Sequence, residues 1–177
     1  SSFDEGSKSC LNIGDMKVNT YLKKAFDVVM MNDQAMRSIA DDESAYKPAL
    51  VILGSSSLVQ SLGSYFFPVR GIVVYRPGFF DIVGESLTTF VIFLLSFYLC
   101  GYFVQEFFKG KIGMEAFVKV MCFASAIGFI GILPRLNIIA GIWGFLIFLA
   151  VLRRIAQIEW EAVAVLVLVI VFASLIV

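Results

Sequence analysis

Two pairs of charged residues in this chain have a spacing and surroundings that could support chemistry inside a membrane. Asp81 and Glu85 are four residues apart at the start of one apolar block, and Glu115 and Lys119 are four residues apart at the start of another. Residues at this spacing share one face of a helix. Placing an acid in a membrane-spanning segment costs free energy, so an acid found there is a candidate for a function such as transport. The alternative for Asp81 and Glu85 is anchoring at the membrane surface, and that for Glu115 and Lys119 is an ion pair that sets the depth of the helix.

Residue types that usually carry catalysis or hold cofactors are scarce in this sequence. It has no histidine, which is the commonest metal ligand and proton shuttle. Its three cysteines, Cys10, Cys100 and Cys122, show no CxxC spacing. No Ser/His/Asp set and no glycine-rich phosphate loop is visible. We therefore expect no enzyme activity, no cofactor and no metal site, and the net charge of zero gives no reason to expect a nucleic-acid partner.

The composition predicts a membrane protein. Hydrophobic residues make up 59% of the 177 residues, charged residues only 16%, and the mean hydropathy is +0.89. A soluble domain of this length could not bury that much apolar surface. Prolines separate apolar blocks that are about as long as a bilayer requires. We expect an all-α integral membrane protein, a bundle of five transmembrane helices within residues 47–177, with spans at 49–67, 82–104, 116–133, 136–152 and 162–177.

The segment that precedes the apolar blocks is polar but patterned. Residues 1–16 indicate a flexible leader, native or added, and residues 17–46 carry apolar side chains at helical spacing. Asn32 or Asp33 can cap a second short helix. One interpretation packs this segment on the rest of the protein. The other, which we favour because no soluble core exists for it to cover, lays it in the headgroup layer with Lys23, Lys24 and Phe26 against membrane lipids.

Lysine and arginine residues divide unequally between the two sides of a five-span chain. Ten fall on the side of the N-terminus and three on the other side. This asymmetry predicts a cytoplasmic N-terminus and an extracytoplasmic or lumenal C-terminus. A basic cytoplasmic face is then expected from the two loops on that side, which contain Lys109, Lys111, Arg153 and Arg154.

Three stretches of the chain resemble the Yip family of membrane proteins, the Ypt/Rab-interacting type. They are "NDQAMRSIADDESAYKPALVIL", "GYFVQEFFKGKIGMEAFVKVMCFASAIGFIGILP" and "IAGIWGFLIFLAVLRRIAQIEWEAVAVLVLVIV", which together extend over about residues 32–177. The resemblance implies five membrane helices, a cytoplasmic N-terminus, no catalysis, and a role in membrane trafficking or shaping. No motif of the family supplies a catalytic residue.

The favoured function is therefore a non-enzymatic membrane scaffold or adaptor that shapes the bilayer or recruits a protein partner. One alternative is a small transporter or channel component that uses Glu85 and the serines of the first span, "GSSSLVQSLGS". The small residues of that span also suit close helix packing. Another alternative is an accessory subunit of a larger membrane complex. Self-association into a homo-oligomer is left open.

Overall fold

The computed structural model describes residues 19–66 and 78–176, and within these ranges it contains helices and no strand. The expected leader, residues 1–16, lies outside the described residues. An N-terminal helix spans residues 19–29. It is followed by α2 (Asp33–Asp41), η1 (Glu43–Ala45), α3 (Tyr46–Phe66), α4 (Phe79–Glu106), α5 (Met114–Ala124), η2 (Ser125–Ile132), α6 (Pro134–Ala150), η3 (Val151–Ile155) and α7 (Trp160–Ile176). The prediction of an all-helical chain is confirmed for these residues.

Among the residues that the structure describes, three helices are long and apolar enough to cross a membrane. They run over Phe79–Glu106, Met114–Ile132 and Leu136–Ile155, and they coincide with the second, third and fourth predicted spans. The first and fifth predicted spans are helical too. However, α3 contains many serines and glycines, and α7 has only 17 residues, the short end of the range of about 17–25 that spans a bilayer. Five membrane spans therefore stay a prediction.

The break between the third and fourth predicted spans follows from proline chemistry. Pro134 occupies the first turn of α6, where its missing N–H has no intrahelical partner to lose. Leu133 before it is extended, with φ −91° and ψ 118°, as residues that precede proline usually are. A new helix thus starts here and the chain does not form one long kinked helix, as predicted, although α6 begins at Pro134 and not after a turn made by "PRLN".

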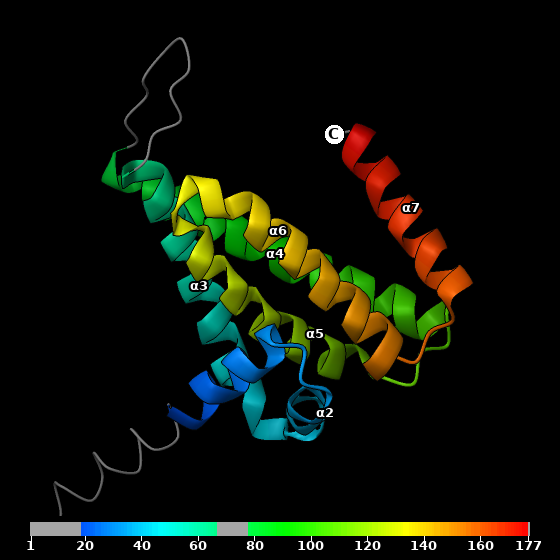
Figure 1. Ribbon diagram of the computed structural model, residues 1–177. Coiled ribbons are helices and arrows are strands. Elements are labelled where there is room, and N and C mark those ends of the chain that lie inside the picture. The colour runs from blue at the N-terminus through cyan, green and yellow to red at the C-terminus, as the bar shows by residue number, and fades with distance from the viewer. Residues whose placement is uncertain (1–18, 67–77, 177) are drawn as a thin grey trace, which may run out of the picture.

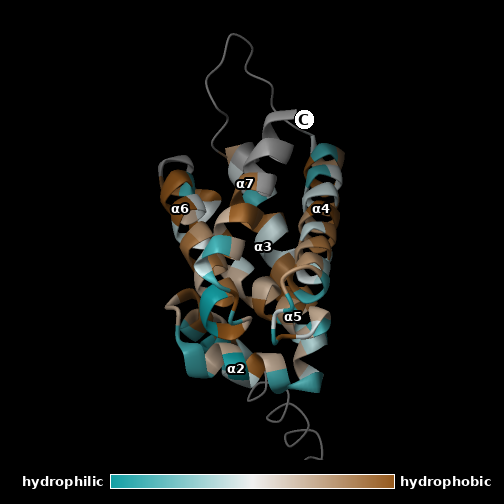
Figure 2. Ribbon diagram, turned by 90° about the vertical axis from the view of Figure 1, so that its right-hand side faces the viewer, coloured by the Kyte–Doolittle hydropathy of each residue, from teal (hydrophilic) through white to brown (hydrophobic). Residues whose placement is uncertain are grey.

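The described helices form a bundle (Figure 1), and we call the end where α2 lies, which carries most of their charged residues, the charged end. In Figure 2, α4 and α6 flank the bundle, α3 and α5 lie between them, and hydrophilic residues gather at the end where α2 lies. In Figure 1, the C-terminal helix α7 stands apart from the others, although Val163 and Leu166 near its start are buried. The lipid solvent expected for such a chain explains why α4 leaves Leu87, Leu95 and Leu99 more than half exposed.

Close packing of α3 against η2 depends on glycine. Gly128 and Gly131 are three residues apart and therefore share one face of this 3₁₀ segment. A Cβ atom added at Gly128 would collide with the side chains of Ser56 and Gln60 on α3. On α3 itself, a Cβ at Gly63 would lie 2.9 Å from a backbone oxygen of η2. The small residues of the first and third predicted spans thus let these two helices approach closely.

Candidate functional site

The charged end of the bundle carries a small helical unit, which we call the N-terminal module (residues 19–45). It consists of the N-terminal helix, α2 and η1. The side chain of Asn32 caps α2, as predicted, by accepting hydrogen bonds from the backbone N–H groups of Gln34 and Ala35. Met36 and Ile39 of α2 are fully buried, and so is Val28 of the N-terminal helix. The argument that this segment has no core to cover is therefore wrong, because it packs into the same core as α5.

A buried lysine of the bundle holds the end of α2. Lys119 on α5 is only 6% exposed, and its Nζ donates to the backbone carbonyl oxygens of Ala40 at 2.8 Å and Asp42 at 2.9 Å. The last carbonyls of a helix have no intrahelical donor and lie at the negative end of its dipole. The expected ion pair between Glu115 and Lys119 is therefore replaced: Lys119 points to α2, and Glu115 is exposed.

Two further contacts join the module to α6 and η3. The indole Nε1 of Trp143 donates to the carbonyl oxygen of Val29 at 2.8 Å, at the end of the N-terminal helix. Arg154 forms an ion pair with Asp33 at 3.0 Å, in the first turn of α2, and its own carbonyl accepts from Arg37 at 3.0 Å. Residues of three bundle elements thus satisfy the termini of both module helices, which fixes the module at several points.

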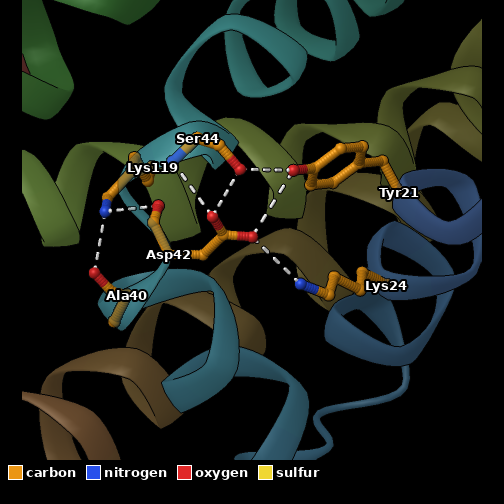
Figure 3. A network of polar contacts seen from close by, with 6 residues as sticks. All are labelled: Tyr21, Lys24, Ala40, Asp42, Ser44 and Lys119. Atoms are coloured by element: carbon orange, nitrogen blue, oxygen red, sulfur yellow. Dashed lines mark hydrogen bonds and ion pairs between the residues drawn. The ribbon is translucent and has the colours of Figure 1, made fainter. Parts of the chain in front are cut away.

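Within the module, the carboxylate of Asp42 is the centre of a polar network (Figure 3). It accepts from the Ser44 hydroxyl at 2.6 Å, from the Ser44 backbone N–H at 3.0 Å and from Lys24 at 3.2 Å. Tyr21 adds a hydroxyl contact to Asp42 at 3.4 Å and one to Ser44 at 2.9 Å. The hydrogen bond from Ser44, with help from the charge of Lys24, holds the pKa of Asp42 below its usual value of 3.8. Asp42 is thus an ionised structural residue whose acceptor sites are in use.

The outer face of the N-terminal helix is apolar and exposed. Leu22, Phe26 and Met30 recur every fourth residue, and their exposed fractions are 52%, 63% and 60%. We call these three residues the outer stripe. Lys23 beside them is exposed as well, whereas Lys24 is turned toward Asp42 at 3.2 Å. Of the three residues expected to meet lipid headgroups, Phe26 and Lys23 face outward and Lys24 is an internal partner.

An open groove runs between the N-terminal helix and the start of α3. It has a volume of about 710 Å³. Its polar lining includes Lys24, Asp42 and Lys47, and its apolar lining includes Leu22 and Val51. A second, smaller cavity of about 270 Å³ lies among α3, α4, α6 and η2, with the polar side chains of Gln60, Ser125 and Asn137 in its lining.

The acidic pair of α4 does not enter either of these spaces. Asp81 accepts a hydrogen bond from the backbone N–H of Gly78 at 2.7 Å and so caps the start of α4. Glu85 is exposed one turn further along. Two serines of α3 bond to their own helix: Ser57 donates to the carbonyl of Leu53 at 2.9 Å, and Ser61 to that of Ser57 at 3.2 Å.

The basic residues expected to form one face share an end of the bundle but differ in their partners. Lys109 and Lys111 are exposed in the turn between α4 and α5. Arg153 donates to the carbonyl oxygen of Ile158 at 2.9 Å and lies 5.4 Å from the centre of the Trp160 ring. Arg154 belongs to the contacts with α2 described above. No group of three or more metal-ligating side chains occurs in the part of the chain that the structure describes.

Several residues of the site were not predicted from the sequence. Tyr21 and Trp143 matter through contacts with residues far away in the chain, and Asp42 adds to its local bonds from Ser44 a contact with Lys24, 18 residues away. Local spacing does not indicate the distant partners. Lys119 did carry a signal, because it stands within the apolar run "FVKVMCFA". A lysine in such a run has to find acceptors other than water, and backbone carbonyls are the usual ones within helical proteins.

Comparison with known proteins adds no family. No family model, no curated protein and no solved structure matches this chain. The resemblance to the Yip family therefore stays a prediction, and the function has to be argued from the geometry of the charged end.

Proposed function

We propose that this protein is a non-enzymatic membrane scaffold whose N-terminal module forms a fixed platform at the membrane surface. The observation that carries the proposal is the outer stripe on a module that is bonded to the bundle through Lys119, Trp143 and Arg154. A platform that is fixed in this way presents the same apolar face at all times. Such a face can insert into the headgroup layer and shape it, or can hold a protein partner there.

The energetics suit shallow insertion. The three side chains of the outer stripe are each about half exposed, and burial of a large apolar side chain contributes about 1.5–3 kcal/mol when it is complete. Moving the exposed parts into the boundary between headgroups and acyl chains thus contributes on the order of 3 kcal/mol in total. This is enough to hold the module against the bilayer once the bundle is embedded, and too little to anchor it alone.

The transport alternative has less support. It depended on Glu85 and on the serines of α3, but Ser57 and Ser61 donate to carbonyls of their own helix, and Glu85 is exposed and lines neither of the two spaces described above. A scaffold needs no such pathway. The cytoplasmic location of the module remains part of the proposal and is supported by the excess of lysine and arginine at this end.

Depth measurements on the outer stripe test the proposal. Phe26→Cys, in a variant without the native cysteines, would carry an environment-sensitive fluorophore in the full chain reconstituted into vesicles. The matched control is Ser38→Cys, since Ser38 is exposed on the neighbouring helix α2. We expect lipid-borne quenchers to quench the label at position 26 much more strongly than the label at position 38. Equal quenching by a water-soluble agent at both positions would contradict the proposal.

Crosslinking in native membranes then separates the two forms of scaffold. A protein that is captured by the full chain in stoichiometric amount, and lost in Phe26→Ser, would identify partner recruitment. Recovery of the chain without such a partner, together with a change in vesicle size on reconstitution that Phe26→Ser reduces, would identify membrane shaping.

A further inference from the structure

We propose that the groove between the N-terminal helix and α3 binds one anionic glycerophospholipid, with its phosphate at Lys47 and one acyl chain beside Leu22 and Val51. The proposal rests on the proposed function, because a lipid can enter only if the module lies against the membrane. It goes further, because it assigns a single lipid with a defined position, in contrast to a diffuse contact with headgroups.

The polar end of the groove has the charge that one phosphodiester requires. Two lysines and one carboxylate line it, which leaves one net positive charge. The carboxylate of Asp42 is satisfied by Ser44, Tyr21 and Lys24, so its charge is neutralised within the network. Lys47 is exposed at the start of α3 and forms no ion pair with any residue that the structure describes. Its ammonium group is therefore the one that can meet a phosphate, and Lys24 keeps two further N–H donors beyond its bond to Asp42.

The other end of the groove is apolar and open. Leu22 is 52% exposed on one wall and Val51 is 70% exposed on the other. Leu58, two helical turns beyond Val51, is also exposed and continues the same face of α3. Because α3 packs alongside the candidate span α4, this face leads from the charged end of the bundle toward the apolar layer. A molecule that fits both ends has a negative head and a hydrocarbon tail.

The size of the groove agrees with this ligand class. Its volume of about 710 Å³ falls within the range of about 300–1,000 Å³ that is typical of sites for small molecules. A free phosphate ion would use only the lysine end, and the apolar walls would stay exposed. A second copy of the chain is the other alternative occupant, and it would have to place a segment that is both anionic and apolar in the groove.

Binding of a defined lipid to the purified protein tests the proposal. The delipidated full chain would be titrated in detergent with palmitoyl-oleoyl phosphatidylglycerol, and bound lipid would be counted by native mass spectrometry. We expect one tightly bound lipid per chain. Lys47→Gln should lower the affinity about five- to tenfold, since one lysine near a lipid phosphate contributes about 1 kcal/mol or somewhat more. Val51→Trp, which fills the apolar end from an exposed position, should lower it at least as much.

Control measurements decide between this site and its alternatives. Lys23 is exposed on the same helix but does not line the groove, so Lys23→Gln should leave the affinity unchanged within about twofold. Equal losses in Lys23→Gln and Lys47→Gln would overturn the proposal in favour of diffuse attraction. Normal binding by Val51→Trp, equal binding of phosphatidylcholine, or complete competition by millimolar inorganic phosphate would overturn it as well. A dimer in light scattering that Val51→Trp abolishes would assign the groove to a second copy.

Failure of this proposal can be told apart from failure of the platform. Phe26 lies outside the groove, so the depth of a label at position 26 reports on the platform alone. A deep label at position 26 with no selective lipid binding would overturn the lipid site and keep the platform.

Discussion

Replacement of Lys119 by methionine should release the N-terminal module from the bundle without unfolding the bundle. Methionine has nearly the same length and keeps the apolar contacts of a side chain that is 6% exposed. It cannot donate to the carbonyl oxygens of Ala40 and Asp42, which the ammonium group now reaches at 2.8 and 2.9 Å. The effect should therefore be confined to the end of α2 and to the segments that it holds.

The magnitude follows from three contributions, two of which destabilise the docked module and one of which stabilises it. A hydrogen bond from a charged group contributes about 1.5–3 kcal/mol, and two are lost here. Against this, burial of a charged ammonium group costs several kcal/mol, which the two hydrogen bonds offset in the native protein. The methionine variant does not have this cost. The carbonyl of Ala40 loses its donor, at a cost of about 1–3 kcal/mol unless water reaches it, whereas the carbonyl of Asp42 keeps its hydrogen bond from the Ala45 N–H at 3.2 Å. We expect a net loss of about 2–4 kcal/mol in the free energy that docks the module.

Hydrogen exchange measures this loss directly. For the chain in lipid nanodiscs, the exchange of peptides from residues 33–45 should accelerate by roughly 30- to 1,000-fold, because about 1.4 kcal/mol corresponds to a factor of ten. Lys111→Met is the matched control, since Lys111 lies at the same end of the bundle with its side chain exposed. Unchanged exchange in residues 33–45, or the same change in the control, would refute the reasoning.

Three smaller predictions use the same kind of measurement. Trp143→Phe loses the bond to Val29 and should weaken docking of the N-terminal helix by about 1 kcal/mol, seen as faster exchange in residues 19–29 while residues 79–106 stay unchanged. Because its pKa is lowered, the ionised form of Asp42 stabilises the module above about pH 4. This stabilisation is lost as the pH falls from 3.8 through the lowered pKa. In Asp42→Asn, the loss of protection against exchange in residues 33–45 that accompanies this fall in pH should therefore be absent. Gly63→Ala should lower the free energy of unfolding by about 1–3 kcal/mol, because the new Cβ would lie 2.9 Å from backbone of η2. Gly84→Ala in α4, where a Cβ would meet nothing within 4 Å, should be neutral or stabilise by up to about 1 kcal/mol, because alanine has the higher helix propensity. A destabilisation of the same size in both alanine variants would contradict this packing argument.

The helical segments of the bundle could be predicted because they depend on local properties. Long apolar runs and the position of Pro134 place α4, the α5–η2 helix and α6 within a few residues. The cap of α2 could likewise be predicted to be Asn32 or Asp33, since capping involves only the next three residues, and the structure shows that it is Asn32.

The assembly of the candidate site could not be predicted, because it depends on contacts between distant parts of the chain. Lys119 lies 79 residues from Ala40, and Trp143 lies 114 residues from Val29. Spacing along one helix suggested Glu115 as the partner of Lys119, but Lys119 lies in the buried part of α5, residues 117–124, and donates to a backbone carbonyl of α2. The spacing of residues along one helix does not indicate which distant helix will pack against it.

The 3₁₀ segment η2 changes how far the second candidate span can reach. A 3₁₀ helix rises about 2.0 Å per residue and an α-helix about 1.5 Å. Met114–Ile132 has 19 residues, of which the last eight are in η2. As a continuous α-helix this segment would be about 28 Å long, whereas with η2 it extends to about 32 Å. The hydrocarbon core of a bilayer is about 30 Å thick, so the tighter winding lets a short helix match the membrane without tilting its neighbours.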